Sequence, residues 1–214
     1  MKKIISTTVM IAMFTSLAFS QNLSNKEMGA GKDTVPFRKF SVSTTFLTFM
    51  NFEDEKTNTQ HYEFHAGYKL TPKDRIGIKV TTWKLFAPMG IPILDAVEQE
   101  ESTFFPGKLS EWGIGVTYQR MLWKGLFAAI EVSPLFKTYL DENGKEIGDG
   151  FKLYTSYHIG YHMRLFKSRF YIEPQIHCNY WPIDTKAPQS FQEEENKWNN
   201  YILFEPNLYI GIKF

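Results

Sequence analysis

The sequence predicts an all-β fold: a transmembrane up-and-down antiparallel β-barrel of eight strands, preceded by a cleaved signal peptide. Three observations lead to this prediction. Apolar residues occupy every second position in eight separate segments, the pattern of strands with one apolar and one polar face. Short turns alternate with long polar connections, and the charged residues of the segments share one face. These features together are typical of barrels that cross a membrane with strands.

The N-terminal residues are expected to lie outside the barrel. A basic start and a mostly apolar stretch end in the small-x-small triplet Ala18-Phe19-Ser20, which predicts a secretory signal peptide over residues 1–20. Residues 21–37 are rich in Asn, Ser, Gly and Lys and are expected to form a flexible periplasmic leader. The barrel itself is assigned to residues 38–214.

Four expected strands lie in the N-terminal half of the barrel. In each, aromatic and aliphatic side chains alternate with polar side chains or glycine. These segments, each with its apolar face, are 38–52 (Phe40, Val42, Phe46, Met50, Phe52), 61–70 (Tyr62, Phe64, Ala66, Tyr68, Leu70), 76–81 (Ile76, Ile78, Val80) and 111–118 (Trp112, Ile114, Val116, Tyr118).

The C-terminal half continues the same alternation. Its segments and their apolar faces are 126–137 (Leu126, Ala128, Ile130, Val132, Phe136), 151–164 (Phe151, Leu153, Tyr157, Ile159, Tyr161, Met163), 170–180 (Phe170, Ile172, Ile176, Cys178, Tyr180) and 202–214 (Ile202, Phe204, Leu208, Ile210, Ile212, Phe214). Pro134, Pro174 and Pro206 also fall on the apolar face, where each removes a backbone donor from the sheet. The sequence offers no account of them beyond local bulges.

The connections between the strands alternate in length. The short ones are residues 71–74, 123–125 and 167–168, and the long ones are residues 53–60, 87–108, 140–150 and 183–197. In outer-membrane barrels the short turns face the periplasm and the long loops face the exterior. The long connections are therefore expected to be extracellular.

The charged residues decide which face is inside. A soluble ligand-binding barrel also alternates, but its outer face is charged and its interior is apolar. Here the polar face carries the charges, which are Glu63, Lys79, Glu111, Glu131, Lys137, Lys152, Arg164, Glu173 and Glu205. Because Lys or Arg against hydrocarbon costs about 2–4 kcal/mol at mid-depth, these side chains are expected to point inward. Side chains fill a lumen of eight strands, which excludes a porin.

Composition excludes several other classes of protein. The formal net charge of +1, from 24 Lys and Arg against 23 Asp and Glu, gives no indication of a nucleic-acid-binding protein. The single cysteine, Cys178, excludes an intramolecular disulfide and a multi-cysteine zinc site. No cofactor and no metal are predicted.

The inward residues predict a polar network in the lumen. Pairing across the short turn after residue 122 places Glu111 directly opposite Lys137, and these two are expected to form an ion pair. Glu131 and Glu205 share the same inward face.

The histidines are expected to belong to this network. Pairing across the turn at 165–170 places His158 beside His177 and His162 beside Glu173, with cross-strand Cβ atoms about 5 Å apart. Such a histidine pair is chemically able to hold a metal or to respond to protonation. A lumenal hydrogen-bond network is the preferred interpretation.

The C-terminal residues resemble an assembly signal. In residues 208–214, apolar residues that include Ile210 and Ile212 alternate up to a terminal aromatic residue, Phe214. This looks like the signal that the barrel-assembly machinery of Gram-negative bacteria recognises. The chain from residue 38 onward resembles the small eight-stranded outer-membrane barrels of the OmpA/OmpX type. The resemblance implies a place in the cell outer membrane, in contact with its lipid and lipopolysaccharide. It implies no common activity, since the family includes adhesion, structural and lipid-modifying proteins.

Two functions remain open after the sequence analysis. The preferred one is a non-enzymatic role, either structural or through the extracellular loop 87–108. The apolar residues of this loop either fold back over the barrel mouth or form a patch for a partner protein; the working hypothesis is that the loop is exposed and dispensable for folding. The alternative is a lipid A-modifying enzyme, an acyl hydrolase or acyltransferase. Lipid A 3-O-deacylase barrels use His and Ser with an acidic partner, and His177-Cys178-Asn179 lacks the serine.

Overall fold

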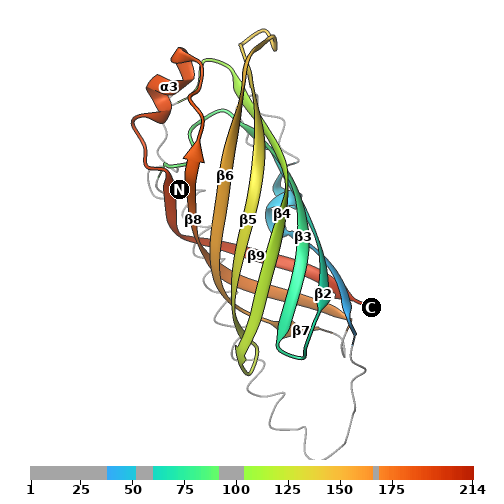
Figure 1. The fold of residues 1–214 in the computed structure, drawn as a ribbon. Coiled ribbons are helices and arrows are strands. Elements are labelled where there is room, and N and C mark those ends of the chain that lie inside the picture. The colour runs from blue at the N-terminus through green and yellow to red at the C-terminus, as the bar shows by residue number, and fades with distance from the viewer. Residues whose placement is uncertain (1–37, 52–59, 92–103, 166–168) are drawn as a thin grey trace, which may run out of the picture. The chain divides into compact units, whose positions relative to one another are not determined.

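A computed structural model describes residues 38–51, 60–91, 104–165 and 169–214, so the expected signal peptide and leader lie outside the described residues. The elements in chain order are β1 (Phe40–Thr45), the 3₁₀ helix η1 (Phe46–Met50), β2 (Gln60–Lys69), β3 (Asp74–Leu85), β4 (Lys108–Trp123), β5 (Leu126–Leu140), β6 (Glu146–Tyr161), β7 (Met163–Arg164), β8 (Phe170–Asp184), the helix α3 (Gln189–Glu195) and β9 (Tyr201–Lys213) (Figure 1). In this part of the chain no helix is long and apolar enough to cross a membrane.

The strands form one closed antiparallel sheet. Strands β1 to β6 pair in sequence order, β8 pairs with both β6 and β9, and the pairing of β9 with β1 closes the barrel (Figure 1). The two-residue strand β7 continues along β8 after an interruption at His162. The predicted fold class, an eight-stranded up-and-down antiparallel barrel, is therefore confirmed, with β7 as an additional short strand.

The two faces of the sheet are sorted as the alternation predicts, except in β7. There Arg164, predicted to point inward, is exposed and Met163, predicted to point outward, is buried, because the chain is interrupted at His162 just before this strand. Outward apolar side chains are widely exposed, for example Val116 at 62% and Ile159 at 63%. Charged side chains such as Lys79, Glu131 and Glu173 are buried in the lumen. This is the inverse of the sorting in a water-soluble barrel, and it suits a surrounding of lipid.

Strand β1 ends earlier than the alternation predicts, because residues 46–50 form η1. The hydroxyl of Thr45 caps this helix by accepting a hydrogen bond from the backbone N–H of Leu47 at 3.3 Å. The side chain of Asn51 then makes the hydrogen bonds to the backbone of β2 that a neighbouring strand residue would otherwise make. Its Nδ2 donates to the carbonyl of His61 at 2.5 Å, and its Oδ1 accepts from the N–H of His61 at 3.0 Å. These local bonds satisfy groups that a longer strand would have paired.

The hairpin of β5 and β6 is longer than predicted. The expected long loop over residues 140–150 is reduced to a turn at residues 141–145. In this turn the carboxylate of Asp141 accepts from the backbone N–H groups of Asn143 and Lys145, each at 2.9 Å, and Gly144 has a φ of 79°. Asp141 and Gly144, residue types that favour turns, thus form a tight turn where the sequence pattern predicts a long loop.

Each outward proline lies near an interruption of the sheet. Pro134 falls in a gap in the β4–β5 ladder, and Pro174 falls opposite the break between β6 and β7. Pro206 lies next to a register shift between β8 and β9, where Phe204 has a φ of 60°. Because proline has no N–H to donate, it is tolerated where a ladder is already interrupted.

Candidate functional site

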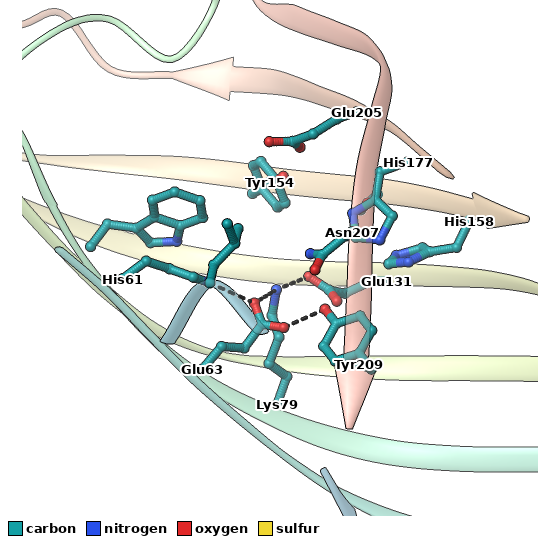
Figure 2. Close-up of a pocket in the computed structure, with 13 residues that line it drawn as sticks. His61, Glu63, Lys79, Glu131, Tyr154, His158, His177, Glu205, Asn207 and Tyr209 are labelled. Atoms are coloured by element: carbon teal, nitrogen blue, oxygen red, sulfur yellow. Dashed lines mark hydrogen bonds and ion pairs between the residues drawn. The ribbon is translucent and has the colours of Figure 1, made fainter. Parts of the chain in front are cut away.

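A polar cluster occupies the middle of the lumen, with Glu63 of β2 at its centre. The Nε2 atoms of His61 and His65 lie 3.3 Å and 2.6 Å from the two oxygens of this carboxylate. The ammonium of Lys79 lies 3.3 Å from Oε2, and the hydroxyl of Tyr209 donates to Oε1 (Figure 2). Alternation sends all of these side chains inward, and closure of the sheet brings β2, β3 and β9 together.

Lys79 links this carboxylate to a second one. Its ammonium also forms an ion pair with Glu131 of β5, which accepts a hydrogen bond from the hydroxyl of Ser133 at 3.1 Å. Glu205 of β9 lines the same cavity, and its Oε2 accepts from Nδ2 of Asn179 at 2.5 Å. We call the inward residues at this level the central cluster: His61, Glu63, His65, Lys79, Glu131, His158, His177, Glu205 and Tyr209.

The histidines predicted to be neighbours are neighbours in the structure. His158 and His177 are Cα partners on β6 and β8, with ring centroids 4.0 Å apart. Nδ1 of His158 lies 3.2 Å from Oε1 of Gln175. The free space in the cavity that these residues line is about 20 Å³, enough for about one water molecule.

A second cluster lies toward the end of the barrel with the short turns, around Glu173 of β8. Its carboxylate lies 2.9 Å from Nη2 of Arg75 and 2.9 Å from Nδ1 of His162, and it accepts from Nε2 of Gln119 at 3.1 Å. The Nε2 atom of His162 lies 2.6 Å from the ammonium of Lys213. The structure therefore brings His162 and Glu173 together at the position given by the predicted register.

A third cluster lies toward the opposite end, and here the predicted ion pair is wrong. Glu111 and Lys137 are Cα partners on β4 and β5, as expected. However, Glu111 forms its ion pair with Lys152 of β6 at 2.8 Å, and Lys137 forms one with Asp184 of β8. The register of two strands specifies neighbours along the barrel wall, whereas long side chains in a narrow lumen also meet across it.

The end of the barrel with the long connections, called here the mouth, is closed by apolar side chains. One cluster consists of Leu85, Phe105, Leu109, Tyr139 and Phe191, and a second consists of Leu135, Tyr154 and Trp181. Met89 packs against both. The ring of Phe191, from α3, is fully buried, with centroids 4.7 Å from Phe105 and 5.1 Å from Tyr139.

Both described ends of loop 87–108 belong to this closure. Ile91 and Phe105 are buried, and the backbone N–H of Phe105 donates to the carbonyl of Phe86 at 2.6 Å. These residues therefore follow the interpretation in which the loop folds back over the mouth, and the hypothesis of a wholly exposed loop is wrong for them. Residues 92–103, with most of the acidic run, lie outside the described residues.

The helix α3 brings an acidic residue to the closed mouth. Glu195 is half-buried at the end of this helix. Burial raises the pKa of its carboxyl, while the nearby ammonium groups of Lys137 and Lys152 act in the opposite direction. Sequence reasoning missed α3, because the segment has no apolar periodicity beyond Phe191.

The structure contains no arrangement typical of an acyl hydrolase among the described residues. No serine hydroxyl is within hydrogen-bond distance of a histidine in these residues, and Cys178 is half-buried on the outward face. All five histidines of the sequence turn toward the lumen, the most exposed of them being His65 and His162.

No family model matches this chain, and no curated protein matches it. A crystal structure of Neisserial surface protein A (NspA) is similar over 82% of this chain and 95% of that chain, with 12% sequence identity and a TM-score of 0.40. The fold class rests on the strand pairings of the chain itself.

A double-mutant cycle is expected to distinguish the observed ion pair from the one predicted by register. Glu111→Gln combined with Lys152→Met should show a coupling energy of about 2–3 kcal/mol, because the two charges are in direct contact and buried. Glu111→Gln combined with Lys137→Met is the matched control, with an expected coupling under about 1 kcal/mol. Urea unfolding of the refolded barrel in detergent micelles measures both. The reverse order of the two couplings would refute the pairing across the lumen.

Proposed function

We propose that this chain is an outer-membrane protein without catalytic activity, which supports the envelope or binds a partner through its extracellular side. The outward apolar face and the inward charges support the membrane location, because the opposite sorting would expose ionised groups to hydrocarbon. The orientation of the histidines carries the non-enzymatic proposal. An enzyme that acts on lipid A needs an acid–base group where the lipid lies, and here every histidine faces the lumen.

The size of the lumenal cavity supports the same proposal. A space of about 20 Å³ is far below the roughly 300–1,000 Å³ of sites that hold small organic ligands. The apolar clusters also close the mouth above it. This cavity is therefore too small for a lipid chain or a drug-sized solute.

Mass spectrometry of lipid A tests the proposal directly. Cells with and without the chain should show the same acyl pattern, and the protein should be recovered from the outer-membrane fraction as a heat-modifiable barrel. Gain or loss of an acyl chain that depends on the protein would instead support the lipid A-modifying alternative.

The extracellular side offers two described surfaces for a partner. The tip of the β5–β6 hairpin and the helix α3 both carry acidic residues. Glu142, Glu146, Asp149 and Glu193 are exposed, whereas Asp141 and Glu194 are half-buried and Glu194 forms an ion pair with Lys197. These charges repel the phosphates of lipopolysaccharide at close range. We therefore favour a protein partner, to be sought by pulldown with the intact barrel and with a hairpin in which the four acidic residues are replaced by Asn or Gln. Loop 87–108 remains a further candidate surface through its central residues.

The C-terminal residue is expected to matter for assembly. Phe214 is 61% exposed on the outward face, and its backbone closes the barrel by donating to the carbonyl of Phe40 at 2.9 Å. Deletion of Phe214 should lower the outer-membrane yield several-fold and leave periplasmic aggregate. Phe214→Ala keeps the backbone pairing and should show most of the loss if the aromatic ring is the signal read by the barrel-assembly machinery. Phe214→Tyr should assemble normally; full yield from Phe214→Ala would show that the ring is not recognised.

A further inference from the structure

Two histidines of the central cluster have ring nitrogens that no neighbouring group satisfies. His158 is 6% exposed and His177 is 5% exposed, and both line the cavity (Figure 2). The Nε2 atom of each is buried and has no hydrogen-bond partner among the described residues. A buried polar atom without a partner costs about 1–3 kcal/mol, so two of them side by side point to an ion or a water molecule bound in the cavity.

The hydrogen bond at Nδ1 of His158 determines whether Nε2 of the same ring carries a proton or a lone pair. Nδ1 faces the side-chain carbonyl oxygen of Gln175 at 3.2 Å. With the amide of Gln175 in this orientation its oxygen accepts from Nδ1–H, which leaves a lone pair on Nε2 in the neutral ring. The same arrangement, one ring nitrogen held by an acceptor and the other free, is the usual second-shell support of a metal-binding histidine.

The charges of the central cluster also favour a cation. Three carboxylates, those of Glu63, Glu131 and Glu205, line the cavity together with a single ammonium, that of Lys79. When all three carboxyls are ionised and the histidines are neutral, the cavity has an excess of two negative charges. Lys79 is held by Glu63 and Glu131, which leaves Glu205, the Cα partner of His177, without a cationic contact among the described residues. Uncompensated buried charge is strongly destabilising.

Protonation of both imidazole rings would not remove the unfavourable interactions in the cavity. Two imidazolium rings with centroids 4.0 Å apart would repel each other. Each would also point a buried Nε2–H at no acceptor among the described residues. A single divalent ion corrects both defects, because it accepts the two lone pairs and supplies two positive charges.

We propose that His158 and His177 bind one divalent transition-metal ion in the barrel lumen. Imidazole nitrogens select Cu²⁺, Ni²⁺ or Zn²⁺ over Ca²⁺ and Mg²⁺, which prefer oxygen, and the order of affinity places Cu²⁺ first. No group of three or more His, Cys, Asp or Glu side chains in the described part of the chain is placed to hold a metal ion, so the two imidazoles, with the one water molecule for which the cavity has room, are the ligands of the ion.

Metal titration of the folded full-length barrel tests this site. The chain is folded from urea into detergent micelles with CuSO₄, NiCl₂ or CaCl₂ present, because the mouth is closed in the folded state. We expect one Cu²⁺ per barrel, an electron paramagnetic resonance spectrum with coupling to two nitrogens, weaker binding of Ni²⁺, and no binding of Ca²⁺. His158→Gln with His177→Gln should lower the Cu²⁺ affinity at least about 100-fold, and Gln175→Leu should lower it about 10–100-fold by loss of second-shell support.

His162→Gln is the matched control, because both ring nitrogens of His162 already have partners in the Glu173 cluster. The affinity of the His162→Gln variant for Cu²⁺ should equal that of the unaltered chain. Unchanged Cu²⁺ affinity in the double variant would overturn the site, as would a spectrum without two nitrogen ligands. If the double variant does not fold, the spectrum and the stoichiometry of the unaltered chain still show whether two histidine nitrogens bind one Cu²⁺.

Discussion

Replacing Lys79 with methionine is expected to destabilise the folded barrel by about 3–5 kcal/mol. The ammonium of Lys79 is buried and contacts the carboxylates of both Glu63 and Glu131. Without it, two buried carboxylates at the centre of the lumen lose the cation that they share. Urea titration of the refolded barrel, followed by heat-modifiable mobility, measures the change in unfolding free energy.

Two further variants show whether charge is the cause. Lys124→Met, in the exposed turn between β4 and β5, removes the same charge from solvent and should change stability by no more than about 0.5 kcal/mol. Lys79→Met combined with Glu63→Gln and Glu131→Gln removes the whole triad and should recover much of the loss, because no ionised group is then left unpaired. A loss below about 1 kcal/mol for Lys79→Met would show that the triad is not a closed, buried network.

The wall of the barrel could be predicted from the sequence because each of its determinants is local. Side chains on a strand alternate with a period of two, so a polar and an apolar face can be assigned without knowing any partner. Short turns then fix the register, which is why Glu111 was correctly placed opposite Lys137, and His158 opposite His177.

Contacts across the lumen could not be predicted in the same way. Lys137 reaches Asp184 and Lys152 reaches Glu111, and in neither pair are the two strands neighbours. Pattern and register say nothing about how far a long side chain extends into the lumen. The sequence pattern places Asp184 in a long extracellular connection and not on an inward strand face, so it does not predict Asp184 as the partner of Lys137.

The sequence pattern does not predict the strand ends that form the mouth, because the apolar side chains change from the outward to the inward positions there. Along the middle of the barrel the apolar residues point outward, but at the ends of β3 and β4 the inward residues are Trp83, Leu85 and Leu109, and the outward ones are Lys84 and Ser110. A pattern search with a constant phase ends the strands at this point. The reversal is itself a signal of strands whose ends close over an apolar core.

Replacing residues 89–105 with a Gly/Ser linker is expected to lower the stability of the barrel by about 4.5–9 kcal/mol. The replaced segment includes Met89, Ile91 and Phe105, which pack in the mouth. Burial of a large apolar side chain contributes about 1.5–3 kcal/mol, so loss of the three gives this range. Cleavage of the mouth by trypsin should also become faster, because α3 loses the contact between Phe191 and Phe105.

A shorter replacement separates the anchoring residues from the rest of the loop. A linker in place of residues 93–103 keeps Met89, Ile91 and Phe105, and the unfolding free energy should then change by less than about 1 kcal/mol. Any partner that binds the loop itself should be lost in both variants, whereas a partner of the β5–β6 hairpin should be retained in the shorter one. Equal destabilisation by both linkers would mean that the three buried side chains are not what holds the mouth closed. Stability unchanged by either linker would mean that the lumenal ion pairs and the strand ladders alone maintain the barrel.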